Sequence, residues 1–124
     1  MNVVDSSGWL EYFSKGVNAT FFKDVIQDTE NLLVPTISSY EVFKRMLILR
    51  GEETALQAAG IMSLGREVVV TQEIAINAAK LSHDLKLAMA DSIILASARV
   101  HNATLWTQDA DFEGIDGVRY ITKG

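Results

Sequence analysis

Short apolar runs rich in β-branched residues alternate along this chain with longer segments that have helical periodicity. Runs this short and this continuously apolar suit strands that are covered on both faces. Strands that alternate with helices predict an α/β sandwich around a parallel sheet, with right-handed crossovers between successive strands. The predicted strands are Asn2–Asp5, Leu32–Pro35, Glu67–Val70, Ala103–Trp106 and Val118–Ile121.

The stretch after the third predicted strand shows the clearest helical pattern. Thr71 stands where an N-cap is expected, and the following "QEIAINAAKLSHDL" places Ile74, Ala78 and Leu81 on one helical face. An amphipathic helix that follows a buried strand is the repeating unit of a fold of this class.

Length and composition narrow the class of protein. The chain has 124 residues, which suits one domain spanning residues 1–124. It has no cysteine, which excludes disulfides and thiolate zinc sites. No apolar run approaches the roughly 18 residues that suggest a membrane span, and the first residues lack the basic segment of a signal peptide. We therefore expect a cytoplasmic protein without a membrane association.

Acidic residues fall where an open α/β sheet binds ligands, beyond the carboxyl ends of its strands. One of them, Asp91, lies in the otherwise apolar or small segment "LAMADSIILASA", where an unpaired charge would be costly to bury. Carboxylates that converge on one edge repel each other, and a hard divalent cation with oxygen ligands removes that conflict. The sequence therefore predicts a metal site, and its candidate ligands are Asp5, Glu41, Asp91, Asp109 and Asp111.

Each of these acids also has a purely structural interpretation. Asp5 suits the N-cap of the helix that follows it, Asp91 suits the first turn of a helix, and Ser38 with Glu41 forms the S-x-x-E pattern of a capping box. The acids after the fourth predicted strand lie in a polar loop, where such residues are ordinary. The two histidines lack ligand spacing and are interpreted as structural. Only the joint placement of the acids on one predicted edge favours the metal site.

Four segments, in this order, resemble a PIN-domain ribonuclease, and more narrowly a VapC-type toxin of a toxin–antitoxin pair. They are "VVDSSGWLEYF", "ISSYEVFKR", "LAMADSIILASA" and "LWTQDADF", and the resemblance covers nearly the whole chain. It matches the four acids of the family to Asp5, Glu41, Asp91 and Asp109, and Asp111 to a further acidic position. The one departure, a Met in "AMADS" where the family more often has Leu, is mild.

The resemblance implies a PIN-like three-layer sandwich, in which a central parallel five-stranded sheet of order 3-2-1-4-5 carries helices on both faces. It also implies a Mg²⁺- or Mn²⁺-dependent endoribonuclease that hydrolyses RNA and leaves a 5′-phosphate and a 3′-hydroxyl. The implied partners are the RNA substrate, a cognate antitoxin protein and a second copy of the chain in a homodimer. Ser6 and Thr107 are candidates to orient the site carboxylates through hydrogen bonds.

The net charge of -5 argues at first against a nucleic-acid partner. Without the four matched acids, however, acidic and basic side chains are nearly balanced, and two divalent ions would cancel the charge of those acids. Local bases can still follow a phosphate backbone. The candidates for RNA contact are Lys44, Arg45 and Arg99, for which a solvated helix face is the alternative.

Aromatic residues are dense near the N-terminus. Trp9, Tyr12 and Phe13 have the spacing of one helix face, and Phe21 and Phe22 would point about 100° apart on a helix. Aromatic side chains often anchor interfaces, and an apolar groove can receive a partner's helix. The five residues therefore predict an antitoxin-binding groove, with packing on the sheet as the alternative.

Three other functions remain open at this point. The chain could be a PIN nuclease of RNA processing that has no antitoxin. It could be a receiver-like signalling domain, although that class needs an acidic pair after the first strand and "NVVDSS" has one acid. It could be an inactive binding module, which would be expected to lack one of the acids.

Overall fold

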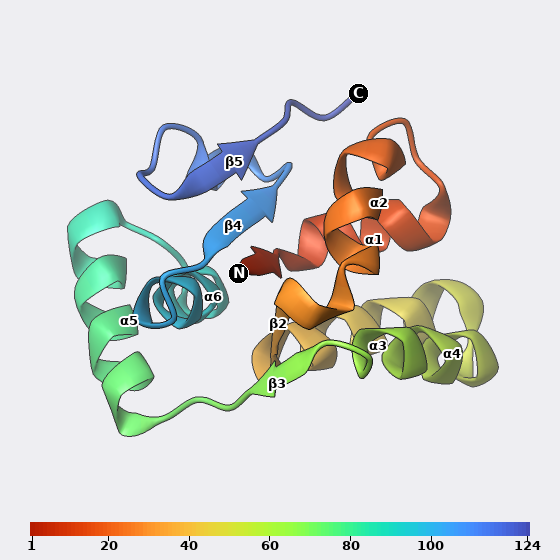
Figure 1. Cartoon of the computed structure of the whole chain (residues 1–124), viewed down its shortest axis with the longest axis horizontal. Coiled ribbons are helices and arrows are strands. Elements are labelled where there is room, and N and C mark those ends of the chain that lie inside the picture. Colours follow the sequence, from red (N-terminus) through yellow and green to blue (C-terminus); the bar gives the residue numbers. More distant parts are fainter.

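The computed structural model describes residues 1–124, and its central feature is a five-stranded sheet (Figure 1). All strand pairs are parallel, and the strand order is β3-β2-β1-β4-β5, as expected. The β1 strand occupies the centre, where it pairs with both β2 and β4. The strands are β1 (Asn2–Val4), β2 (Leu32–Pro35), β3 (Arg66–Val68), β4 (Thr104–Thr107) and β5 (Val118–Tyr120).

Helices cover both faces of this sheet (Figure 1). On one face lie α1 (Ser6–Ser14), α2 (Ala19–Gln27), α3 (Thr36–Arg50) and α4 (Glu52–Met62). On the other face lie α5 (Gln72–Leu85) and α6 (Met89–Val100). Short 3-10 helices, η1 (Thr29–Asn31) and η2 (Ala110–Phe112), precede β2 and follow β4.

Alternation along the strands divides the core into two layers. Val3 and Leu33 pack in the cluster beneath α5 and α6, whereas Val4 and Val34 pack with the helices of the opposite face. Successive side chains of a strand point to opposite faces, so a strand covered on both sides needs apolar residues at every position. This explains why β2 and most of β1 are apolar at successive positions rather than alternating with polar residues.

The third predicted strand is shifted relative to its observed position. It was expected at residues 67–70, but β3 is Arg66–Val68, and Val69 and Val70 are exposed beyond it. The cause is its only partner: β3 lies at the sheet edge and pairs with β2, and that pairing ends where Pro35 meets Val68. After Pro35 the chain enters α3, so the next residues of the β3 segment have no neighbour.

The predicted capping box on Ser38 and Glu41 is wrong. The chain passes from β2 directly into α3, which begins at Thr36 with Pro35 as its N-cap residue. Ser38 is therefore inside the helix, where its side chain is fully buried. The other predicted cap is confirmed, because Thr71 accepts a 3.2 Å hydrogen bond from the Ile74 N–H at the start of α5.

No helix in the structure is long and apolar enough to cross a membrane.

Candidate metal centre

Asp5 lies between the end of β1 and the start of α1, where it is only 3% exposed. Its Oδ2 atom accepts hydrogen bonds from the Ser7 hydroxyl (2.8 Å), the Thr107 hydroxyl (3.0 Å) and the Ser7 N–H (3.4 Å). It is thus the N-cap of α1, as its structural interpretation requires. Burial raises the pKa of this carboxyl, against the lowering effect of the three donors.

Thr107 joins Asp5 to the segment that follows β4. While its hydroxyl donates to Asp5, its oxygen accepts a 2.9 Å hydrogen bond from the Asp109 N–H. Asp109 in turn accepts a 3.0 Å bond from the Asp111 N–H and so begins the η2 helix. One buried threonine therefore fixes the placement of an acid on β1 and of another after β4.

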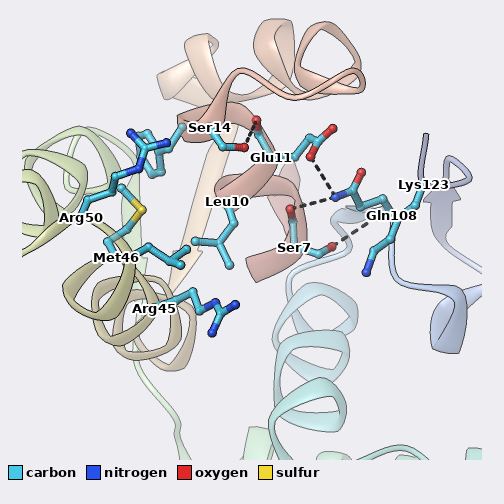
Figure 2. Close-up of a pocket in the computed structure, with 11 residues that line it drawn as sticks. Ser7, Leu10, Glu11, Ser14, Arg45, Met46, Arg50, Gln108 and Lys123 are labelled. Carbon is cyan, nitrogen blue, oxygen red and sulfur yellow. Dashed lines mark hydrogen bonds between the residues drawn. The ribbon is translucent and has the colours of Figure 1, made fainter.

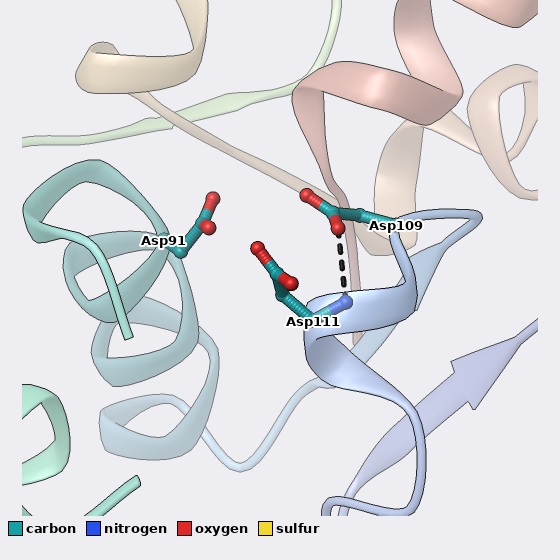
Figure 3. Close-up of side chains that lie close together, drawn as sticks. All are labelled: Asp91, Asp109 and Asp111. Carbon is teal, nitrogen blue, oxygen red and sulfur yellow. Dashed lines mark hydrogen bonds between the residues drawn. The ribbon is translucent and has the colours of Figure 1, made fainter. Parts of the chain in front are cut away.

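Asp91 lies in the first turn of α6 and faces the acids that follow β4 (Figure 3). Carboxylate oxygens of Asp91, Asp109 and Asp111 lie within 4.8 Å of one another. Burial, together with the negative charges of Asp5, Asp109, Glu41 and Asp111, raises the pKa of Asp91 to about 7. The apolar segment "LAMADSIILASA" thus places the Asp91 carboxylate near four other carboxylates.

Glu41 comes to this edge from α3. Its Oε1 atom accepts a 2.7 Å hydrogen bond from the Ser6 hydroxyl at the start of α1. The structure thus brings the five predicted acids to the carboxyl edge of the sheet, although only three of them form the closest group. Asp111, which the resemblance matched only to a further acidic position, belongs to that group, whereas Asp5 and Glu41 do not.

The donor set fits a hard divalent cation. Every candidate ligand is a carboxylate, which is the ligand type that Mg²⁺ and Mn²⁺ prefer. No lysine or arginine forms an ion pair with these acids, and the one ion pair in the structure joins His83 and Asp84 of α5. Protonation or a bound cation relieves the repulsion within such a cluster of carboxylates.

Sequence reasoning missed a second polar network, which supports the Thr107–Asp109 segment from behind. Gln108 is buried, and its side chain accepts a 3.0 Å bond from Asn18 and donates to Glu11 at 3.4 Å. Ser7 completes the network, because its hydroxyl bonds both Asp5 and the Gln108 N–H. The sequence positions of these two residues could have indicated their role, since Gln108 stands between two predicted site residues and Ser7 stands two residues after Asp5.

The three predicted RNA contacts are placed differently. Arg45 and Lys44 lie on α3 and line a small cavity together with Glu41. The Lys44 amine lies 5.8 Å from the centre of the Tyr40 ring. Arg99 is not brought to the site, because it lies in the last turn of α6 and donates a 3.1 Å bond to the carbonyl of Asp116.

The predicted aromatic groove is wrong for two of its five residues. Trp9 and Phe22 are fully buried core residues, because α1 and α2 each pack on the sheet and on one another. Phe21 is half-buried against Trp106, with ring centroids 5.2 Å apart. Only Tyr12 and Phe13 line a surface pocket, beside the lysines of the α1–α2 region. Phe22→Ala would therefore open a core cavity rather than test a groove.

The strand order excludes the receiver-like alternative. Receiver domains have the order 2-1-3-4-5, whereas this sheet has β3-β2-β1-β4-β5. The inactive-module alternative is also weakened, because none of the expected acids is missing and all five converge. The strand order and the acids gathered at the carboxyl edge of the sheet narrow the class of protein to open α/β folds with an acidic site.

Comparisons with known proteins identify the class. The PIN domain family model matches residues 3–118. The chain therefore belongs to the PIN domain family, whose members are nucleases. No curated protein sequence matches the chain significantly.

Solved structures resemble the chain over nearly its full length. A toxin–antitoxin complex from Klebsiella pneumoniae contains a chain that is 26% identical, with a TM-score of 0.79 and 96% of each chain covered. Mycobacterium tuberculosis VapC20, described as a Sarcin-Ricin loop cleaving toxin, is 18% identical, with a TM-score of 0.76 and coverage of 94% and 95%. VapBC2 from Rickettsia felis, bound to a promoter DNA fragment, is 14% identical, with a TM-score of 0.75 and coverage of 98% and 97%.

Proposed function

We propose that this protein is a metal-dependent endoribonuclease that acts as the toxin of a toxin–antitoxin pair. Membership of the PIN family supports the nuclease activity, and the similarity to solved toxin–antitoxin complexes supports the role as a toxin. The observation that carries the proposal is the convergence of five carboxylates; burial, together with the charges of the other four, raises the pKa of Asp91 to about 7.

In this proposal, Asp91, Asp109 and Asp111 hold a Mg²⁺ or Mn²⁺ ion, with Asp5 and Glu41 beside them as further ligands. A bound divalent cation would supply positive charge next to the scissile phosphate and lower the pKa of a water molecule. Hydrolysis by water in line with the leaving 3′ oxygen produces a 5′-phosphate and a 3′-hydroxyl.

The chain's own contribution is to hold these carboxylates in a fixed arrangement before substrate arrives. Thr107 and Ser7 donate to the same oxygen of Asp5, which leaves its Oδ1 atom without a donor from the protein. Ser6 holds Glu41 through a 2.7 Å hydrogen bond. Neutral donors of this kind orient a carboxylate without competing for its charge.

The proposed partners are RNA, an antitoxin and a second copy of the chain, and the proposed location is the cytoplasm. The pocket beside Tyr12 and Phe13 is the remaining part of the predicted antitoxin groove, which Tyr12→Ala would test. Light scattering at micromolar concentration tests the homodimer. A monomer at that concentration would overturn this part of the proposal while leaving the nuclease untouched.

The nuclease activity is tested by incubating the protein with a mixed RNA pool in Mn²⁺ and in EDTA. We expect cleavage in Mn²⁺ only, with 5′-phosphate ends that can be ligated and sequenced, and no cleavage by Asp91→Asn. Asp84→Asn provides a matched control, because this acid is exposed on α5 and pairs only with His83. Cleavage in EDTA, or full activity in Asp91→Asn, would refute the proposed mechanism.

A further inference from the structure

A cavity of about 270 Å³ lies between α1, α3 and the C-terminal segment (Figure 2). We call it the α1–α3 groove. Its apolar wall consists of Leu10 and Phe13 from α1 and Met46 and Leu49 from α3. Leu49 is 55% exposed, so the groove presents apolar surface that no part of the chain covers.

The groove is continuous with the acidic edge of the sheet. Ser7 and Gln108 line it, and both lie in the network that holds Asp5 and the segment before Asp109. On the α3 side, Arg45 lines both the groove and the adjacent cavity that contains Glu41. A ligand in the groove would therefore extend directly from the proposed cleavage site.

The charged side chains that line the groove are mainly cationic. Arg45 and Arg50 project from α3, and Lys123 approaches from the opposite side after β5 (Figure 2). None of the three has an ion-pair partner. The single acid in the lining, Glu11, already accepts hydrogen bonds from the Asn18 N–H (2.8 Å) and the Gln108 amide (3.4 Å). In a chain of net charge -5, three unpaired cations around one groove form a local site for a polyanion.

We propose that the α1–α3 groove binds the RNA strand next to the scissile phosphate. This proposal rests on the proposed nuclease function. Arg45, Arg50 and Lys123 contact successive phosphates, and the groove's apolar wall, including Phe13, packs against bases of the unpaired strand. The acidic site repels a polyanion, so the substrate needs flanking cations to hold it there. The charge of the groove favours RNA over an apolar peptide as its occupant.

The test compares Arg50→Gln/Lys123→Gln with Arg66→Gln/Lys80→Gln, which removes the same two charges outside the groove. All four residues are exposed, so neither double variant should disturb folding. For an unpaired RNA oligonucleotide containing the preferred cleavage site, the groove variant should raise KM several-fold with kcat retained. The control variant should keep the wild-type KM.

Salt dependence gives a second readout that a merely structural role would not produce. Binding is measured by fluorescence anisotropy of the same oligonucleotide, in an Asp91→Asn background that does not cleave it. The slope of log K against log salt concentration should fall by about 0.7 for each phosphate contact removed from a single strand. Two lost contacts would therefore be visible as a change in slope as well as in affinity.

The outcomes separate this inference from the proposed function. If wild-type protein cleaves RNA and the groove variant matches it in KM and salt slope, the groove does not carry the strand. If the groove variant instead loses only the binding of an antitoxin peptide, the occupant is a peptide and the inference is overturned. If wild-type protein cleaves no RNA, the proposed function fails, and an unchanged salt slope in the anisotropy measurement then rejects the groove independently.

Discussion

Asp91 occupies an environment that makes its ionised form costly in the metal-free protein. It is half-buried in the first turn of the apolar helix α6, and four other carboxylates act on it through space. Folding holds a proton on this group over a pH range in which the unfolded chain has already released it. The stability of the metal-free protein therefore depends on pH through this residue.

The first prediction concerns that dependence. The pKa of Asp91 rises from 3.8 to about 7 on folding, so its stabilising effect is complete below 3.8 and is lost as the pH rises to about 7. The unfolding free energy should fall by about 1–2 kcal/mol over this range, which is less than the full pKa shift implies because solvent screens a half-buried group. Urea unfolding in EDTA between pH 4 and pH 8 would measure it.

The matching variant is Asp91→Asn, whose side chain cannot titrate. In this variant the unfolding free energy should depend less on pH than in the wild type. A residual slope should remain, because burial also raises the pKa of Asp5. An Asp91→Asn curve as steep as that of the wild type would show that Asp91 does not carry the effect.

The second prediction concerns Thr107, which is buried between two acids. Thr107→Val removes a donor to Asp5 and the acceptor of the Asp109 N–H. We expect a lower cleavage rate and a loss of about 1–3 kcal/mol in unfolding free energy, because Asp5 loses one of its three donors and the Asp109 N–H loses its acceptor. Thr104→Val is the control, since it makes the same change in the same strand at its other end. Equal effects of the two changes would show that Thr107 has no special role in the site.

At the level of elements, β1 and β2 were predictable because a doubly covered strand leaves a simple signature, a nearly uninterrupted apolar run. The ends of elements were less predictable, since they depend on partners that are remote in sequence. The β3 strand stops at Val68 because β2 turns into α3 at Pro35, which is a fact of pairing and not of local composition. Ser38 was misread for the same reason, because nothing local shows that a helix starts before it.

The site was predictable to the extent that acids mark strand ends. The residues that hold those acids were less so, because serine, threonine and glutamine occur in any loop. Ser6 and Thr107 were identified by their neighbours, whereas the Gln108 network requires the α1–α2 connection and the C-terminal segment to come together. The aromatic residues were harder to interpret. The spacing of Trp9, Tyr12 and Phe13 indicates that they share a helix face, but it does not show whether that face packs in the core or binds a partner.

The third prediction concerns the contact between α1 and α2. A Cβ atom on Gly8 would lie 2.6 Å from the Phe22 ring and 2.7 Å from Val4. Gly8→Ala should therefore push α1 off the core and cost about 1–3 kcal/mol. Gly60 in α4 has no atom within 4 Å of an added Cβ, so Gly60→Ala should stabilise the protein by about 0.5–1 kcal/mol. Chemical denaturation of both variants tests the pair, and a Gly8→Ala protein as stable as Gly60→Ala would contradict the packing argument.

For the whole molecule, the acidic edge joins segments from both ends of the chain and from both helical layers. Asp5 follows β1, Glu41 lies on α3, Asp91 on α6, and Asp109 follows β4. A cation bound at this edge would therefore bind the folded chain only, because the unfolded chain does not bring these groups together. Binding to the folded state alone raises stability by mass action.

The fourth prediction follows from that linkage. Mn²⁺ at 100 times its dissociation constant should stabilise the wild-type protein by about 2.7 kcal/mol. Calorimetry in MnCl₂ and in EDTA, at matched ionic strength, would show the rise in Tm. Asp91→Asn should show a much smaller rise, whereas Asp84→Asn should behave as the wild type. An equal rise in Asp91→Asn would place the cation elsewhere.

The central position of β1 has a consequence for how the protein is made. Thr107 and Asp5, which meet at the edge of the sheet, are separated by 102 residues. At a synthesis rate of roughly 5–20 residues per second, about 5–20 s pass between the appearance of the first and the second. Throughout that time the nascent chain has neither β4 beside β1 nor the acids that follow β4. Chains that end before Asp109 therefore lack the assembled site, because two of its acids are missing.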